Sequence, residues 1–123
     1  NFISISPEMY LGEILHKAVA KSSRSNFPVV NERNEFLGIL LLDDIRAIMF
    51  DKKLYKKVKV SGLMHSAPDI ISYEKDSMEE IMSKFKTSGA WNLPVIKNGQ
   101  YFGFISKSRL LTAYRRKLID VTA

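Results

Sequence analysis

The chain has 123 residues, of which 46% are hydrophobic and 26% charged, as in an ordinary globular domain. It contains no run of about eighteen apolar residues that would cross a membrane, and the absence of cysteine excludes disulfides and thiolate metal sites. The net charge of +6 suits nucleic acid, an anionic membrane surface or a phosphate-bearing ligand, and does not choose among them.

The amino-terminal half predicts a mixed sequence of strands and helices. A short alternating strand is followed by an amphipathic helix from about Pro7, where a missing N–H is tolerated, to Ala20. Next come a strand from Phe27 to Val30, a turn, a buried strand over 36–42 and a helix over 43–50. We expect the lysine-rich stretch over 52–59 to form a solvated helix face.

The carboxy-terminal half predicts the same order of elements. Asp76 or Ser77 can cap a helix whose apolar stripe contains Met78, Ile81, Met82 and Phe85. Strands over 93–96 and 101–105 flank Asn98-Gly99, which favours a type I′ hairpin turn. A closing helix follows from Lys107 to about Leu118.

The two halves are copies of one unit. When the sequence is shifted by 66 positions, Asn26-Phe27-Pro28-Val29-Val30 falls on Asn92-Leu93-Pro94-Val95-Ile96, and one deletion later Leu37-Gly38-Ile39 falls on Phe102-Gly103-Phe104. Two long copies favour a face-to-face pair rather than a solenoid, which needs more repeats. We assign residues 1–62 and 63–123 to the two copies.

The proline, β-branched pair, turn, glycine, apolar strand and helix of each copy resemble the cystathionine-β-synthase (CBS) motif. Ser22 to Val30, Asp44-Ile45-Arg46 and Phe104 to Arg109 with Tyr114-Arg115 look like the cytosolic tail of bacterial CLC chloride proteins. The resemblance implies an α+β fold of two βαββα repeats related by a pseudo-two-fold axis. It also implies a regulatory module, commonly dimeric, in the cytoplasmic part of an inner- or plasma-membrane chloride channel or transporter.

In this family the clefts between repeats often hold AMP, ADP, ATP or S-adenosylmethionine. The resemblance implies that backbone amides before the central strand hold adenine, and that a carboxylate at the closing helix takes the ribose hydroxyls. The serine or threonine and helix amides nearby suit phosphate.

Neither copy carries the full ligand pattern of glycine, strand, hydroxyl residue and aspartate. In the first copy Leu41 replaces the hydroxyl residue, and in the second Arg109 replaces the aspartate. Our first choice for a nucleotide cleft comprises Asp44, Ile70, Ala90, Trp91, Asn92 and Leu93. A second cleft, suited to phosphate or left empty, comprises Arg24, Ser25, Phe27, Ser106, Ser108 and Arg109.

Each of these residues also has a plain structural interpretation. Asp44 could serve only as a helix N-cap, Trp91 could belong to the core or a dimer interface, and Arg109 could be a surface residue. A ligand-free module that dimerises and docks on its membrane partner is the alternative function.

Catalysis and nucleic-acid binding are not expected. The two histidines, His16 and His65, have no metal-ligand or acid–base spacing, and each is interpreted as a solvent-facing or packing residue. The basic residues are not interleaved with exposed aromatic residues as a nucleic-acid surface requires.

Overall fold

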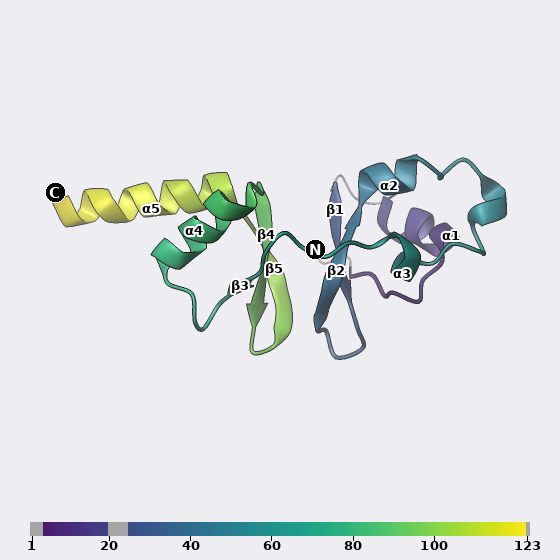
Figure 1. Cartoon of the computed structure of the whole chain (residues 1–123), viewed down its shortest axis with the longest axis horizontal. Helices are drawn as coiled ribbons and strands as arrows, with labels where there is room; N and C mark the ends of the chain where they lie inside the picture. Colours follow the sequence, from purple (N-terminus) through teal and green to yellow (C-terminus); the bar gives the residue numbers. More distant parts are fainter. Residues whose placement is uncertain (1–3, 20–24, 123) are drawn as a thin grey trace. The chain divides into compact units, whose positions relative to one another are not determined.

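The computed structural model describes residues 4–19 and 25–122. The chain divides into two compact units, Asn1–Ser66 and Ala67–Ala123 (Figure 1). Both mix helices with strands, so the predicted α+β class is confirmed. Within the described residues, no helix is both long and apolar enough to span a membrane.

The first unit is a two-stranded antiparallel sheet with short helical segments beside it. An isolated parallel bridge joins Ile5 to Val29 on β1. In chain order, the elements are α1 (Leu11–Ile14), a π-helical segment η1 (Leu15–Val19), β1 (Asn26–Val30), β2 (Phe36–Leu41), α2 (Leu42–Arg46), a 3-10 segment η2 (Lys52–Leu54) and α3 (Val60–Leu63).

The second unit has a three-stranded sheet in the order β3-β4-β5, in which β3 is parallel to β4 and β5 antiparallel to it. Both long helices lie on the same side of this sheet (Figure 1). The elements are β3 (Ile71–Ser72), α4 (Met78–Ser88), β4 (Asn92–Lys97), β5 (Gln100–Ser106) and α5 (Lys107–Thr122).

The duplication in the sequence is repeated in the backbone pairing. Ile5 pairs with Val29 as Ile71 pairs with Val95. The antiparallel pairs β1–β2 and β4–β5 each carry a bulge directly after that valine. In addition, the Leu42 N–H donates to the Ser25 carbonyl, and the Lys107 N–H to the Trp91 carbonyl. Each copy therefore holds its pre-strand loop against the start of its own closing helix.

The hairpin and capping predictions for the second copy are confirmed. Asn98 and Gly99 both have positive φ, at 52° and 77°, as a type I′ turn requires. Ser77 is the N-cap of α4, its hydroxyl accepting the Glu80 N–H, and Gly89 ends the helix in the left-handed conformation.

The prediction that the first helix begins near Pro7 is wrong. Residues 7 and 8 form a turn, and α1 begins only at Leu11. The reason is tertiary: the N–H groups of Leu11 and Gly12 donate to the carbonyls of Val58 and Tyr55, which lie far along the chain. The predicted end at Ala20 lies outside the described residues.

Two further predictions of helices need correction. The helix expected over 43–50 is α2, which ends at Arg46 and continues as turns. The lysine-rich stretch forms the short η2 rather than a full helix face. Its apolar residues nevertheless face inward, since Leu54, Tyr55 and Val58 pack against the first core.

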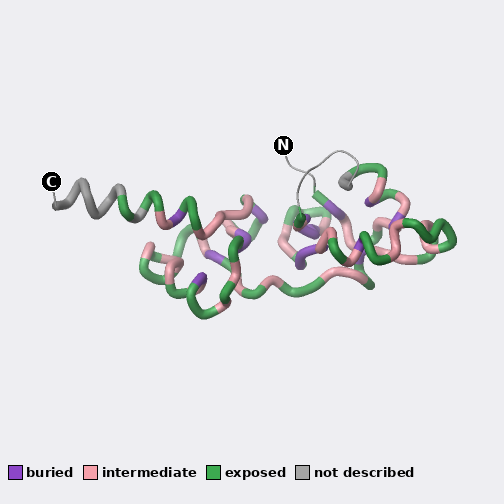
Figure 2. Tube along the Cα trace, turned by 90° about the horizontal axis from the view of Figure 1, so that it is seen from above, coloured by how far each residue is buried: buried purple, intermediate pink, exposed green. Residues whose placement is uncertain are grey.

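Each unit has its own hydrophobic core, and Figure 2 shows buried positions in both. The first core joins Leu11 and Ile14 of α1 to strand residues such as Phe27 and Leu40. The second contains Ile71, Phe85, Leu93 and Leu110, with Met78, Ile81 and Met82 packed against it. The predicted apolar stripe of α4 is thus confirmed, and burial of these side chains is the main stabilising term of each unit.

Candidate functional site

Asp44 lies in the first turn of α2, directly after β2 ends. The N-cap of this helix is Leu41, with no side-chain cap, so the interpretation of Asp44 as an N-cap is wrong. The Asp44 side chain is 38% exposed. A carboxylate here remains available to a ligand because it does not satisfy the helix backbone.

His65 contacts Asp44. Its Nε2 lies 2.5 Å from Oδ2 of the carboxylate, although the two residues are 21 positions apart. Because the bond uses Oδ2, the other oxygen, Oδ1, accepts no hydrogen bond among the described residues. Sequence reasoning treated His65 as a linker histidine and missed this contact, since no local spacing pattern links the two residues.

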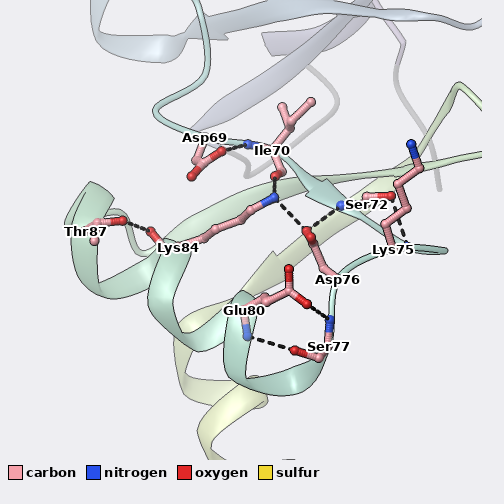
Figure 3. Close-up of polar contacts among 9 residues, drawn as sticks. All are labelled: Asp69, Ile70, Ser72, Lys75, Asp76, Ser77, Glu80, Lys84 and Thr87. Carbon is pink, nitrogen blue, oxygen red and sulfur yellow. Dashed lines mark hydrogen bonds and ion pairs between the residues drawn. The ribbon is translucent and has the colours of Figure 1, made fainter.

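Ile70 is fixed through its backbone in the second unit (Figure 3). Its N–H donates to Asp69 Oδ1 at 2.8 Å, and its carbonyl accepts from Lys84 Nζ at 2.8 Å. The Ile70 side chain stays 46% exposed. The backbone is thus held while an apolar surface is presented to solvent.

The same lysine anchors a nearly buried carboxylate. Lys84 Nζ donates to Asp76 Oδ2 at 2.7 Å, and the Ser72 N–H donates to the same oxygen at 2.9 Å (Figure 3). Burial raises the pKa of Asp76, but the bonds from Lys84 and Ser72 and the charge of Lys84 outweigh it, so the pKa lies below its ordinary value. The α4 helix is thereby tied to the segment that carries Ile70.

The loop before β4 presents Trp91 to solvent. Its side chain is 76% exposed, so the interpretation as a core residue is wrong. Lys107 Nζ lies over the indole ring, 5.7 Å from its centroid. Ala90 donates its N–H to Ser88 Oγ, and Leu93 is fully buried, so Leu93 presents no exposed surface to a ligand.

The residues of the second predicted cleft lie in both units. Ser106 Oγ accepts the Arg109 N–H at 3.2 Å and lies 3.4 Å from Ser108 Oγ, which places three polar groups at the start of α5. Ser108 and Arg109 also line a surface hollow with Thr112 and Ala113. Phe27 is fully buried in the first core, and Arg24 lies outside the described residues.

Within the second unit, the structure brings together residues that were predicted for different clefts. Asn92 pairs with Ser106 across β4 and β5, and the backbone bond from Lys107 to Trp91 continues this contact. In the first unit Ser25 meets the start of α2 in the same way. The grouping of Asp44 with residues 90–93 crosses from one unit to the other and stays a prediction.

Sequence reasoning also missed an apolar cavity of about 490 Å³ in the second unit. Alternating aromatic residues of β5 were the available signal. Its lining includes Ile71, Tyr73, Met78, Phe102, Phe104 and Leu110. Among the described residues, no group of histidine and carboxylate side chains could hold a metal ion.

The chain belongs to the CBS domain family, whose model matches residues 1–51 and 60–116. No curated protein sequence matches the chain. The match to both halves agrees with the duplicated backbone pairing described above.

Solved structures share this fold. CBSX2, in complex with AMP, has 20% identity and a TM-score of 0.69, with 94% of this chain and 89% of that chain covered. CbpB, in complex with c-di-AMP, has 20% identity and a TM-score of 0.74, with 98% and 81% covered. The CBS domain of a bacterial CNNM/CorC family Mg²⁺ transporter, in complex with ATP, has 16% identity and a TM-score of 0.72, with 90% and 77% covered.

Proposed function

We propose that this chain is a non-catalytic regulatory module that binds an adenine nucleotide, with the Asp44 carboxylate contacting the ribose hydroxyls. The observation that carries the proposal is a partly exposed carboxylate in the first turn of the helix that closes the first copy, whose Oδ1 accepts no hydrogen bond among the described residues. Similar CBS structures in complex with AMP, c-di-AMP and ATP support the ligand class.

The nucleotide would meet three kinds of group. Asp44 accepts hydrogen bonds from the ribose, Ile70 and Trp91 offer exposed apolar surface to adenine, and the backbone of residues 90–92 offers polar groups to the base edge. The hydroxyls of Ser106 and Ser108 and the side chain of Arg109, at the start of α5, are a second, phosphate-directed candidate site.

The test is isothermal titration of the full chain with AMP, ADP, ATP, c-di-AMP and S-adenosylmethionine. Asp44→Ala removes a charge-assisted hydrogen bond and should weaken binding by about 1–3 kcal/mol, roughly 5- to 150-fold. Asp43→Ala is the matched control, because its carboxylate is the adjacent one and pairs only with Arg46 at 3.5 Å among the described residues. Loss of nucleotide binding in Arg109→Ala, with binding kept in Asp44→Ala, would assign the ligand to the second candidate site instead.

Equal affinity in wild-type protein and Asp44→Ala would remove Asp44 from the site. Absence of heat with every nucleotide would favour the second candidate function, a ligand-free module for homodimerisation and docking. Two residues favour that candidate, namely Leu41 in place of the hydroxyl residue and Arg109 in place of the second aspartate.

We further propose that the module is the cytoplasmic part of a CLC-type chloride channel or transporter, in the same chain as its transmembrane domain. The support is the resemblance of Ser22 to Val30 and of Phe104 to Arg109 to bacterial CLC tails. Purified module should bind a CLC membrane domain in nanodiscs and not a CNNM/CorC membrane domain; equal or no binding to the two would contradict this assignment.

A further inference from the structure

The backbone of His65 lies along the edge of β2. Its N–H donates to the Ile39 carbonyl, and its carbonyl accepts the Ile39 N–H, both at 2.8 Å. Gly38 permits this approach, because a Cβ at that position would lie 2.6 Å from the His65 carbonyl oxygen. The linker between the two copies is therefore held against the strand that leads into α2.

This backbone position brings the His65 side chain to Asp44. A carboxylate accepts hydrogen bonds and does not donate them, so the shared proton lies on Nε2 of the imidazole and His65 donates to Oδ2. The neighbouring Asp43 is directed to Arg46 instead. Of the two adjacent carboxylates, only Asp44 is held by a residue from a distant part of the described chain.

An anchored carboxylate is better prepared to bind a diol than a freely rotating one. Each carboxylate oxygen has two acceptor positions, so within the described part of the chain the bond from His65 leaves three positions open on Asp44. A side chain that is already fixed loses less conformational entropy when it binds. The 2′- and 3′-hydroxyls of ribose need two acceptors in a defined orientation, which a fixed Asp44 would supply.

We propose that His65 is a positioning residue for Asp44. By holding the Asp44 carboxylate in place, His65 makes the site selective for a ribose over a deoxyribose. This inference rests on the proposed nucleotide-binding function and adds to it a residue outside the duplicated motif. Loss of the His65 donor frees the Asp44 side chain and weakens the contact with the ribose diol, while contacts with base and phosphate remain.

The experiment compares AMP with 2′-deoxy-AMP, which keeps base and phosphate but lacks one diol hydroxyl. Isothermal titration of the wild-type chain should show about 10- to 150-fold tighter binding of AMP, the value of one hydrogen bond to a charged group. His65→Ala should lose most of this ratio through weaker AMP binding, while 2′-deoxy-AMP, which keeps only the 3′-hydroxyl contact with Asp44, should lose much less affinity.

His65→Gln is the rescue variant, since its amide nitrogen can replace Nε2 as donor, and it should restore most of the selectivity. His16→Ala is the matched control, because His16 is exposed in η1, and it should leave both affinities unchanged. Equal loss of both ligands in His65→Ala, or no rescue by His65→Gln, would show a merely structural role and overturn the inference.

The two proposals fail in different ways. If wild-type protein binds no AMP, the proposed function fails and this inference fails with it. If Asp44→Ala no longer binds AMP but His65→Ala prefers AMP over 2′-deoxy-AMP as strongly as wild type does, the nucleotide site stands and the positioning role is overturned. The melting temperature of each variant should lie within a few degrees of that of wild type. This measurement ensures that the affinities of folded proteins are compared.

Discussion

Replacement of Gly38 by alanine tests whether the linker is held against β2. The added Cβ would lie 2.6 Å from the His65 carbonyl oxygen, closer than non-bonded carbon and oxygen approach, and the neighbour is backbone rather than a flexible side-chain end. Either β2 or the linker must therefore move, and both hydrogen bonds between Ile39 and His65 are weakened.

The expected loss follows from these two bonds. Each contributes a net 0.5–1.5 kcal/mol or so, which gives about 1–3 kcal/mol for the pair. Alanine also restricts the unfolded chain, which offsets about 0.4–1 kcal/mol. We expect Gly38→Ala to lower the free energy of unfolding by about 1–2 kcal/mol.

Urea denaturation measures this change as a lower midpoint at constant slope. Gly62→Ala in α3 is the matched control, because among the described residues no atom beyond its chain neighbours and its own helix lies within 4 Å of the added Cβ, and it should be neutral or more stable by up to about 1 kcal/mol. Amide exchange of Ile39 and His65 should accelerate only in Gly38→Ala. Equal stability of the two variants, with unchanged exchange, would refute the arrangement.

Two further predictions concern the second unit. Asp76 has a lowered pKa in the folded chain, so its stabilising contribution is present above its unfolded pKa and is lost as the pH falls through the lower folded value. Asp76→Asn should therefore lower the free energy of unfolding at pH 7, and lower it progressively less as the pH falls. A difference in unfolding free energy between wild type and variant that does not change with pH would contradict the ion pair with Lys84. Ser77→Ala removes the N-cap of α4 and should cost about 1 kcal/mol in urea denaturation, whereas Ser83→Ala, inside the same helix, should cost less than 0.5 kcal/mol. Equal losses in the two serine variants would argue against the cap.

The elements that depend on local sequence were predictable. The Asn98-Gly99 turn and the Ser77 cap were found because one or two residue types suffice to favour each of them. The duplicated register located the strands to within one residue, since both copies carry the same proline and glycine positions. Periodicity also identified the buried face of α4.

The parts that depend on distant contacts were not predictable. The late start of α1 follows from backbone bonds to Tyr55 and Val58, and no local pattern near Pro7 signals them. The contact between His65 and Asp44 likewise arises because a linker lies beside β2. For the candidate site, residue types were found from the family pattern, while the partner that holds the carboxylate became visible only in three dimensions.

The exposed indole of Trp91 gives the protein a built-in optical probe. The chain has a single tryptophan, so its emission comes from one loop and needs no label or subtraction of other indoles. Because the ring is largely in water, with a lysine ammonium over its face, any partner that covers the ring or displaces that ammonium will change the colour or intensity of the emission. Events at the start of β4 can thus be followed in real time in the unmodified protein.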